Sequence, residues 1–262
     1  MKKYLLQILL MFFVVGNLSA QSYYKMWAKQ ERKDATFTKR EIKKAAKEYA
    51  KLIYEDAKKQ KEIREDWVRM SEKKQIKKKK DLFALRIQSF RNARFKVKEG
   101  SKHSLEEQTM TEIDLAWNFD SKTFFPEKIE GQAKVISKTY EAAIEKAMVM
   151  ARSNLASEIV HEVMMQFAYK DFVKEFGLDK SQEITQAILD VREPLTEEIG
   201  EVIVAQEIFN SKNYASTEVM LRIFYDGSAA IYDFKKTLDK VITDDPDLVR
   251  AIKSFLDEPI NN

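Results

Sequence analysis

The chain has 262 residues, of which 34% are charged and 44% hydrophobic, with only 6 glycines and 4 prolines. This composition is typical of a folded, helix-rich globular protein. The chain contains no cysteine, which excludes disulfides, thiolate metal sites, a cysteine nucleophile and lipid attachment through cysteine.

The formal net charge of +4 hides a division within the chain. Residues 21–100 carry 26 Lys and Arg against 12 Asp and Glu, whereas residues 101–262 carry 18 against 30. This asymmetry predicts a basic helical arm (21–100) followed by an acidic body (101–262). The arm is either attracted to a polyanion or simply a solvated helical face, and the interleaved acids favour the solvated face. Contact between the two halves is a third interpretation.

The first 20 residues have the pattern of a secretory signal peptide. Lys2 and Lys3 give a positive start, residues 5–15 are almost wholly apolar, and residues 16–20 are mostly small or polar. This apolar run of about 11 residues is shorter than the roughly 20 needed to span a bilayer. We therefore expect cleavage before Gln21 and an exported protein, periplasmic or associated with the outer membrane, with no transmembrane segment in the mature chain.

In the arm, Thr38 and Glu41 form a capping-box pattern that predicts the start of a long amphipathic helix. Six of the eight positions 73–80 are lysines. This run either continues the helix or forms a mobile joint, since its like charges repel one another. An apolar pattern returns over 82–90. The candidate contacts to an anionic surface are Lys73, Lys74, Lys77, Lys78, Lys79, Lys80, Arg91 and Arg94.

Bases and aromatics are mixed over residues 86–95, a combination that can stack on single-stranded nucleic acid. Export argues against nucleic acid as a partner, and aromatics at helical spacing are more often core residues. We therefore do not expect a nucleic-acid interface.

The body begins with a capped short helix from Ser104 to about residue 119, followed by a strand over 131–137 and a helix from Tyr140 that extends to about 167. Alanines four residues apart on this helix predict close approach by a sheet or another helix. These are Ala143, Ala147 and Ala151.

The rest of the body alternates helix, hairpin and helix. A helix is predicted over 182–198, interrupted or bent near Pro194. Strands over 201–209 and 218–225 form a hairpin around a turn at 210–213. Two amphipathic helices follow, over 230–242 and from Asp245-Pro246 to the C-terminal region. The fold class predicted is α+β, a small three-stranded sheet packed by long helices, with its core at about 128–242.

The order of these segments resembles the twenty-kilodalton bacterial envelope lipoprotein family and its uncharacterised secreted relatives. The resemblance covers roughly residues 128–228 and is carried by the strand at 131–137, the alanine-spaced helix through Leu155 and Ile159, and the paired strands at 201–225. It implies a compact α+β domain in the cell envelope, and it implies no enzyme activity or ligand residues. The lipidated cysteine of the family is missing here, and the basic arm is not part of the resemblance.

Catalytic patterns are poor. His103 and His161 are the only histidines, which excludes a multi-histidine metal site, and the sequence after His161 lacks the second histidine of the zinc-protease pattern. We interpret His161 as a partly exposed helix residue. No Gly-x-Ser-x-Gly elbow or phosphate loop occurs. We predict no catalytic residue, metal or cofactor, with an uncharacterised hydrolase as the remaining enzyme alternative.

The function expected from the sequence is that of an exported, non-enzymatic cell-envelope protein that acts as an assembly or interaction component. Its partner is expected to be an envelope protein or a second copy of the chain. The alternative is a binding module for a small molecule, or for an anionic lipid surface or wall polymer of the envelope.

Overall fold

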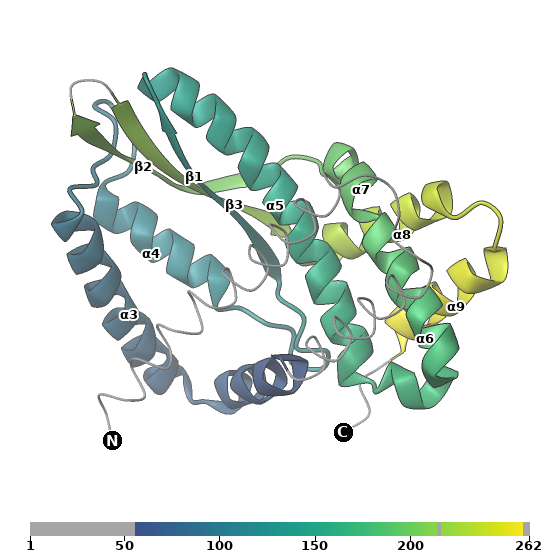
Figure 1. Cartoon of the computed structure of the whole chain (residues 1–262). Coiled ribbons are helices and arrows are strands. Elements are labelled where there is room, and N and C mark those ends of the chain that lie inside the picture. The colour runs from purple at the N-terminus through teal and green to yellow at the C-terminus, as the bar shows by residue number, and fades with distance from the viewer. Residues whose placement is uncertain (1–55, 214–215, 259–262) are drawn as a thin grey trace. The chain divides into compact units, whose positions relative to one another are not determined.

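The computed structural model describes residues 56–213 and 216–258 (Figure 1). The predicted signal peptide and the start of the helix predicted at Thr38 lie outside these residues, whereas residues 56–69 are helical. The named elements that follow are α3 (Glu72–Asn92), α4 (Leu105–Ala116), β1 (Lys128–Ser137), α5 (Tyr140–Tyr169), α6 (Phe172–Asp190), α7 (Arg192–Glu198), β2 (Ile203–Asn213), β3 (Ser216–Asp226), α8 (Gly227–Val241) and α9 (Pro246–Asp257).

The strands form one antiparallel sheet in the order β1-β3-β2. Ala133 of β1 pairs with Leu221 of β3, which pairs in turn with Glu207 of β2. Paired residues share a face of the sheet, and successive residues alternate between faces. The predicted α+β class, with a small three-stranded sheet packed against helices, is confirmed.

Helix α5 covers one face of the sheet (Figure 1). Ala143, Ala147 and Ala151 on α5 are fully buried, as their spacing predicts. The close approach also requires Gly131 on β1, because a Cβ there would lie 2.4 Å from the carbonyl oxygen of Ala151 and 2.6 Å from Cβ of Leu155. This face is closed by small residues that let helix and strand backbones meet.

Helix α4 covers the opposite face, with α3 beside it. Ser104 caps α4 as predicted, since its hydroxyl accepts the N–H of Glu107 and the carboxylate of Glu107 accepts the N–H of Ser104. A small apolar cluster of Phe90, Phe95 and Ile208 joins the end of α3 to β2. The described part of the predicted arm therefore packs on the body.

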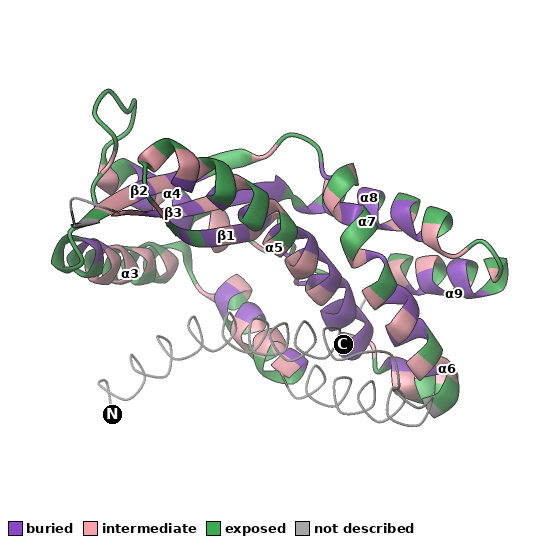
Figure 2. Ribbon diagram, turned by 45° about the horizontal axis from the view of Figure 1, so that its top comes forward, coloured by how far each residue is buried: buried purple, intermediate pink, exposed green. Residues whose placement is uncertain are grey.

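The second half of α5 is almost wholly buried (Figure 2), because α6, α7, α8 and α9 pack around it. Aromatic rings join these helices. The ring centroids of Phe167 and Phe255 lie 4.7 Å apart, and those of Phe176 and Phe255 lie 5.1 Å apart. Most of the apolar core lies between α5, the sheet and these four helices.

Three predicted boundaries differ from the structure. The helix predicted from residue 182 already begins at Phe172. Gly177, with φ of 75°, forms a kink in this helix, and a glycine there interrupts the helical pattern of the sequence before residue 182. The interruption predicted near Pro194 falls at Val191, and Pro194 lies in the first turn of α7, where a missing N–H is tolerated. The turn predicted at 210–213 is wrong, because these polar residues belong to β2.

Pairing explains that error. Asn210 pairs with Glu218 and Asn213 with Ser216, so the hairpin strands continue beyond the predicted turn. Backbone pairing does not require apolar side chains at a solvent-exposed hairpin end.

Candidate functional site

The lysine run at 73–80 continues the helix rather than forming a joint, because all of it lies in α3. Lys73, Lys74, Lys77, Lys78 and Lys80 are exposed. We call these five residues the lysine face. None of them lies within 4.0 Å of a carboxylate oxygen in the described part of the chain. Lys73, Lys77 and Lys80 follow helical spacing and therefore project from one side of α3.

The other candidate contacts have different surroundings. Lys79 is half-buried, and its Nζ lies 2.8 Å from a carboxylate oxygen of Asp114 on α4. Arg91 is exposed and pairs with Glu106 at 2.7 Å. Arg94 is exposed just beyond α3, in the left-handed region with φ of 59°. Five of the eight candidate residues thus lie together without an ion pair to a described residue, and Lys79 is directed towards the body.

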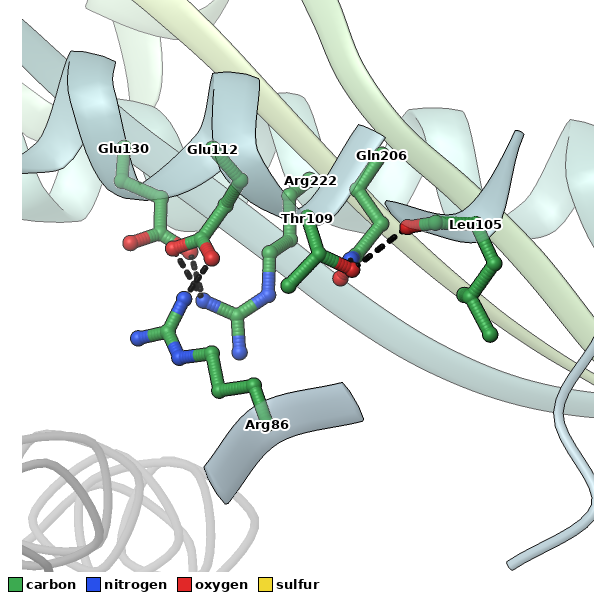
Figure 3. Close-up of polar contacts among 7 residues, drawn as sticks. All are labelled: Arg86, Leu105, Thr109, Glu112, Glu130, Gln206 and Arg222. Carbon is green, nitrogen blue, oxygen red and sulfur yellow. Dashed lines mark hydrogen bonds and ion pairs between the residues drawn. The ribbon is translucent and has the colours of Figure 1, made fainter. Parts of the chain in front are cut away.

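On its inner side, α3 joins a buried ionic network (Figure 3). Arg86 of α3 pairs with Glu112 of α4, whose side chain is fully buried. Nη1 of Arg222 on β3 donates to Glu112 at 3.0 Å and to Glu130 of β1 at 2.7 Å. The four residues, two cations and two anions, tie α3, α4 and the sheet together. We call them the ionic network.

A separate, neutral hydrogen-bond chain lies beside this network on α4. Nε2 of Gln206 on β2 donates to Oγ1 of Thr109 at 3.3 Å, and Thr109 donates to the carbonyl of Leu105 at 2.7 Å (Figure 3). Side chains of α4 therefore reach both β2 and β3.

The charges of the ionic network balance one another. Burial, followed by repulsion from Arg222, lowers the pKa of Arg86 to about 10, and Glu130 opposes this shift. Arg86 remains a cation at neutral pH. With two cations and two anions in contact, the network holds α3 and α4 against the sheet.

A second buried pair fixes the helix over residues 56–69. The guanidinium of Arg64 donates to both carboxylate oxygens of Glu162 on α5, at 2.8 and 2.6 Å, and to the carbonyl of Phe124 at 3.1 Å. Burial lowers the pKa of Arg64, but attraction to Glu162 outweighs it and the pKa lies above its ordinary value. This bidentate geometry is strong and specific.

Glu158 lies one helical turn before Glu162. Burial raises its pKa to about 8, and repulsion from Glu162 and Glu130 acts in the same direction, while Arg64 opposes it. This carboxyl group therefore holds its proton at neutral pH. Sequence reasoning gave no indication of it, because the main cause is burial, which depends on the fold, and Glu130 approaches from β1.

Sequence reasoning also missed the ionic network. Arg86 was interpreted as part of a basic and aromatic mixture, although Arg222 stands on the polar side of the alternation in β3. A charged residue on that side of the strand indicates that this face of the sheet carries charge. The identity of its partners is not readable locally, because Glu112 and Arg222 are 110 residues apart.

Among the described residues, no three His, Asp or Glu side chains are grouped to hold a metal ion. His103 is exposed in the loop before α4, and His161 is half-buried on α5, as interpreted from the sequence. Two open grooves lie in this part of the chain, one between α8 and α9 and one beside Val149 and Met150.

No helix within residues 56–213 and 216–258 is long and apolar enough to cross a membrane. Comparison with protein-family models, curated proteins and solved structures finds no match to this chain. The geometry of α3 and its surroundings therefore carries the functional argument.

Proposed function

We propose that the chain is an exported, non-enzymatic interaction component of the cell envelope, and that it binds an anionic lipid surface through the lysine face of α3. One observation carries this proposal. Five exposed lysines that form no ion pair with a described residue stand on the outer side of a helix whose other side is fixed by ion pairs.

The concentration of charge favours an anionic partner. Lysines one turn apart on a helix repel one another, and the free energy of this repulsion falls when an anionic surface approaches. Residues 73–80 extend over about 11 Å of helix. Each lysine near an anionic membrane contributes about 1 kcal/mol, so the lysine face contributes about 5 kcal/mol.

Docking of α3 removes part of the cost of binding. A disordered lysine run would lose conformational entropy on binding. Here the ionic network, the Lys79–Asp114 pair and the Arg91–Glu106 pair already hold the helix. The lysine face is therefore preorganised, and its side chains alone must adapt to the surface.

The location in the proposal comes from the sequence. The signal-peptide pattern predicts export, and the resemblance to the envelope lipoprotein family implies the same compartment. The missing lipidated cysteine makes reversible electrostatic attachment the alternative to a covalent anchor. The small-molecule alternative has less support, because the two grooves found among the described residues are open to solvent.

The test is co-sedimentation of the purified protein with phosphatidylglycerol vesicles and with neutral phosphatidylcholine vesicles. All variants share one N-terminus, established by mass spectrometry, so any lipid affinity of residues 1–20 is common to them. We expect binding to phosphatidylglycerol only, weakened by salt, and lost in the triple variant Lys73→Gln, Lys77→Gln, Lys80→Gln.

The matched control removes three lysines elsewhere, in the variant Lys102→Gln, Lys138→Gln, Lys174→Gln. These lysines are exposed and lie in separate parts of the body. The proposal predicts that the control retains its affinity. Equal loss in both variants would indicate an effect of net charge alone, and retention in both would overturn the role of the lysine face.

A further inference from the structure

The two edges of the sheet differ in how they are covered. At the outer edge of β2, Lys96 and Phe209 exchange backbone hydrogen bonds of 2.9 and 2.8 Å, and the side chain of Gln108 accepts the N–H of Glu207. Uncovered edges favour pairing with another chain. The edge of β2 is therefore partly closed by the protein itself.

The outer edge of β1 is open over its last residues. Nδ2 of Asn154 on α5 donates to the carbonyl of Gln132, so this carbonyl points away from β3. Backbone direction alternates along an antiparallel strand, so Lys134 and Ile136 direct their N–H and C=O groups the same way. No described residue forms a backbone hydrogen bond to these outward groups.

Exposed apolar side chains lie on both faces of this open edge. Ile136 is 56% exposed on the face opposite α5, and on α5 Val149 is 69% and Met150 47% exposed. Val135, Val149 and Met150 line an open groove together with Glu145 and Lys146. Grouped apolar residues on a surface mark an interaction site more often than scattered ones.

We propose that this edge pairs with the same edge of a second copy, antiparallel about a two-fold axis through Val135. Lys134 of each copy then faces Ile136 of the other, and their outward backbone groups exchange hydrogen bonds. The result is a continuous six-stranded sheet. The α5 helices of both copies lie on the same side of this sheet, with Val149 and Met150 near the axis.

Charge complementarity favours a second copy as the occupant. The groove carries one carboxylate and one ammonium group, Glu145 and Lys146, so it has no net charge and does not repel a second copy of itself. Lys134 does not oppose the pairing, because its Nζ lies 2.9 Å from a carboxylate oxygen of Glu218 in its own chain. The contact is thus neutral and self-complementary.

Sedimentation velocity of the full chain over a dilution series tests the pairing. We expect a monomer–dimer equilibrium that Ile136→Pro and Val149→Asp each weaken by about tenfold or more, which corresponds to about 1.4 kcal/mol. Proline removes an N–H that points away from β3, so the fold is retained, as circular dichroism will check. Tyr232→Asp, at a residue 68% exposed on α8, is the control and leaves dimerisation unchanged.

A cysteine scan tests the register, because the chain has no natural cysteine. Directly opposite residues at a non-hydrogen-bonded pair have Cα atoms about 4.5 Å apart, within disulfide range. Val135→Cys is therefore expected to form a disulfide-linked dimer on oxidation, and Tyr232→Cys is not. A monomer at all concentrations, or a dimer insensitive to Ile136→Pro and Val149→Asp, would overturn the proposal and leave residues 1–55 or another protein as the occupant.

Discussion

The two faces of the sheet are covered by helices in different ways. Towards α5, Gly131 and the alanines of the helix bring backbones into contact through small side chains. Towards α4 and α3, Arg222 and Glu130 meet Glu112 and Arg86 (Figure 3). The first face depends on size, since an added methyl group does not fit. The second depends on charge balance, since the loss of one partner leaves another charge buried.

Removing the central carboxylate is expected to have the largest effect on stability. Glu112→Gln leaves two largely buried guanidinium groups with one carboxylate, and breaking a buried pair costs about 3–5 kcal/mol. Urea unfolding will measure this loss in the free energy of unfolding. Glu106→Gln, which breaks the exposed pair with Arg91, is expected to cost less than about 1 kcal/mol. A smaller loss for Glu112→Gln than for Glu106→Gln would contradict the buried network.

Adding one methyl group tests the apolar face. Gly131→Ala places Cβ against the backbone of α5, and such overpacking costs about 1–3 kcal/mol. Gly200→Ala is the matched control, because its Cβ would meet Tyr225 Oη at 3.4 Å, an ordinary contact. We expect a change within about 0.5 kcal/mol there. Equal unfolding midpoints for the two variants would argue against the close approach of β1 and α5.

The pKa of Glu158 predicts a pH effect. Its pKa is about 8 in the folded protein and about 4.3 when unfolded. The folded state therefore binds the extra proton between these values, and this residue lowers stability progressively as pH rises from about 4 to about 8. Glu158→Gln should melt at a higher temperature than the wild type at about pH 9, with the difference shrinking near pH 4. A difference independent of pH would contradict the assignment.

Neutralising the lysine face is expected to have the smallest effect on folding. The variant Lys73→Gln, Lys77→Gln, Lys80→Gln breaks no ion pair with a described residue and relieves repulsion, so its free energy of unfolding should change by less than about 0.5 kcal/mol. Thermal unfolding checks this. A large loss of stability would show that these lysines support the fold, and the vesicle result could not then be assigned to binding.

Local sequence patterns predicted the helices and strands in which apolar residues recur at regular spacing. Alternation revealed the strands, and the spacing of Ala143, Ala147 and Ala151 revealed the buried side of α5. Patterns did not predict contacts between distant residues, because only the fold brings the four residues of the ionic network together. The start of α6 was missed for a local reason, since Gly177 interrupts the helical pattern. The sequence predicted the lysine run because six lysines lie within eight residues, whereas only the structure shows that α3 packs on α4.

Hydrogen exchange of α3 tests the central claim most directly, namely that ionic contacts hold a helix on the sheet and so present the lysine face. It is measured in the wild type and in Glu112→Gln under conditions where both stay folded. We expect α3 amides to be protected in the wild type and to exchange faster in the variant, while β1 and α5 remain protected. Rapid exchange of α3 in the wild type, or an equal loss of protection in α5, would contradict the account.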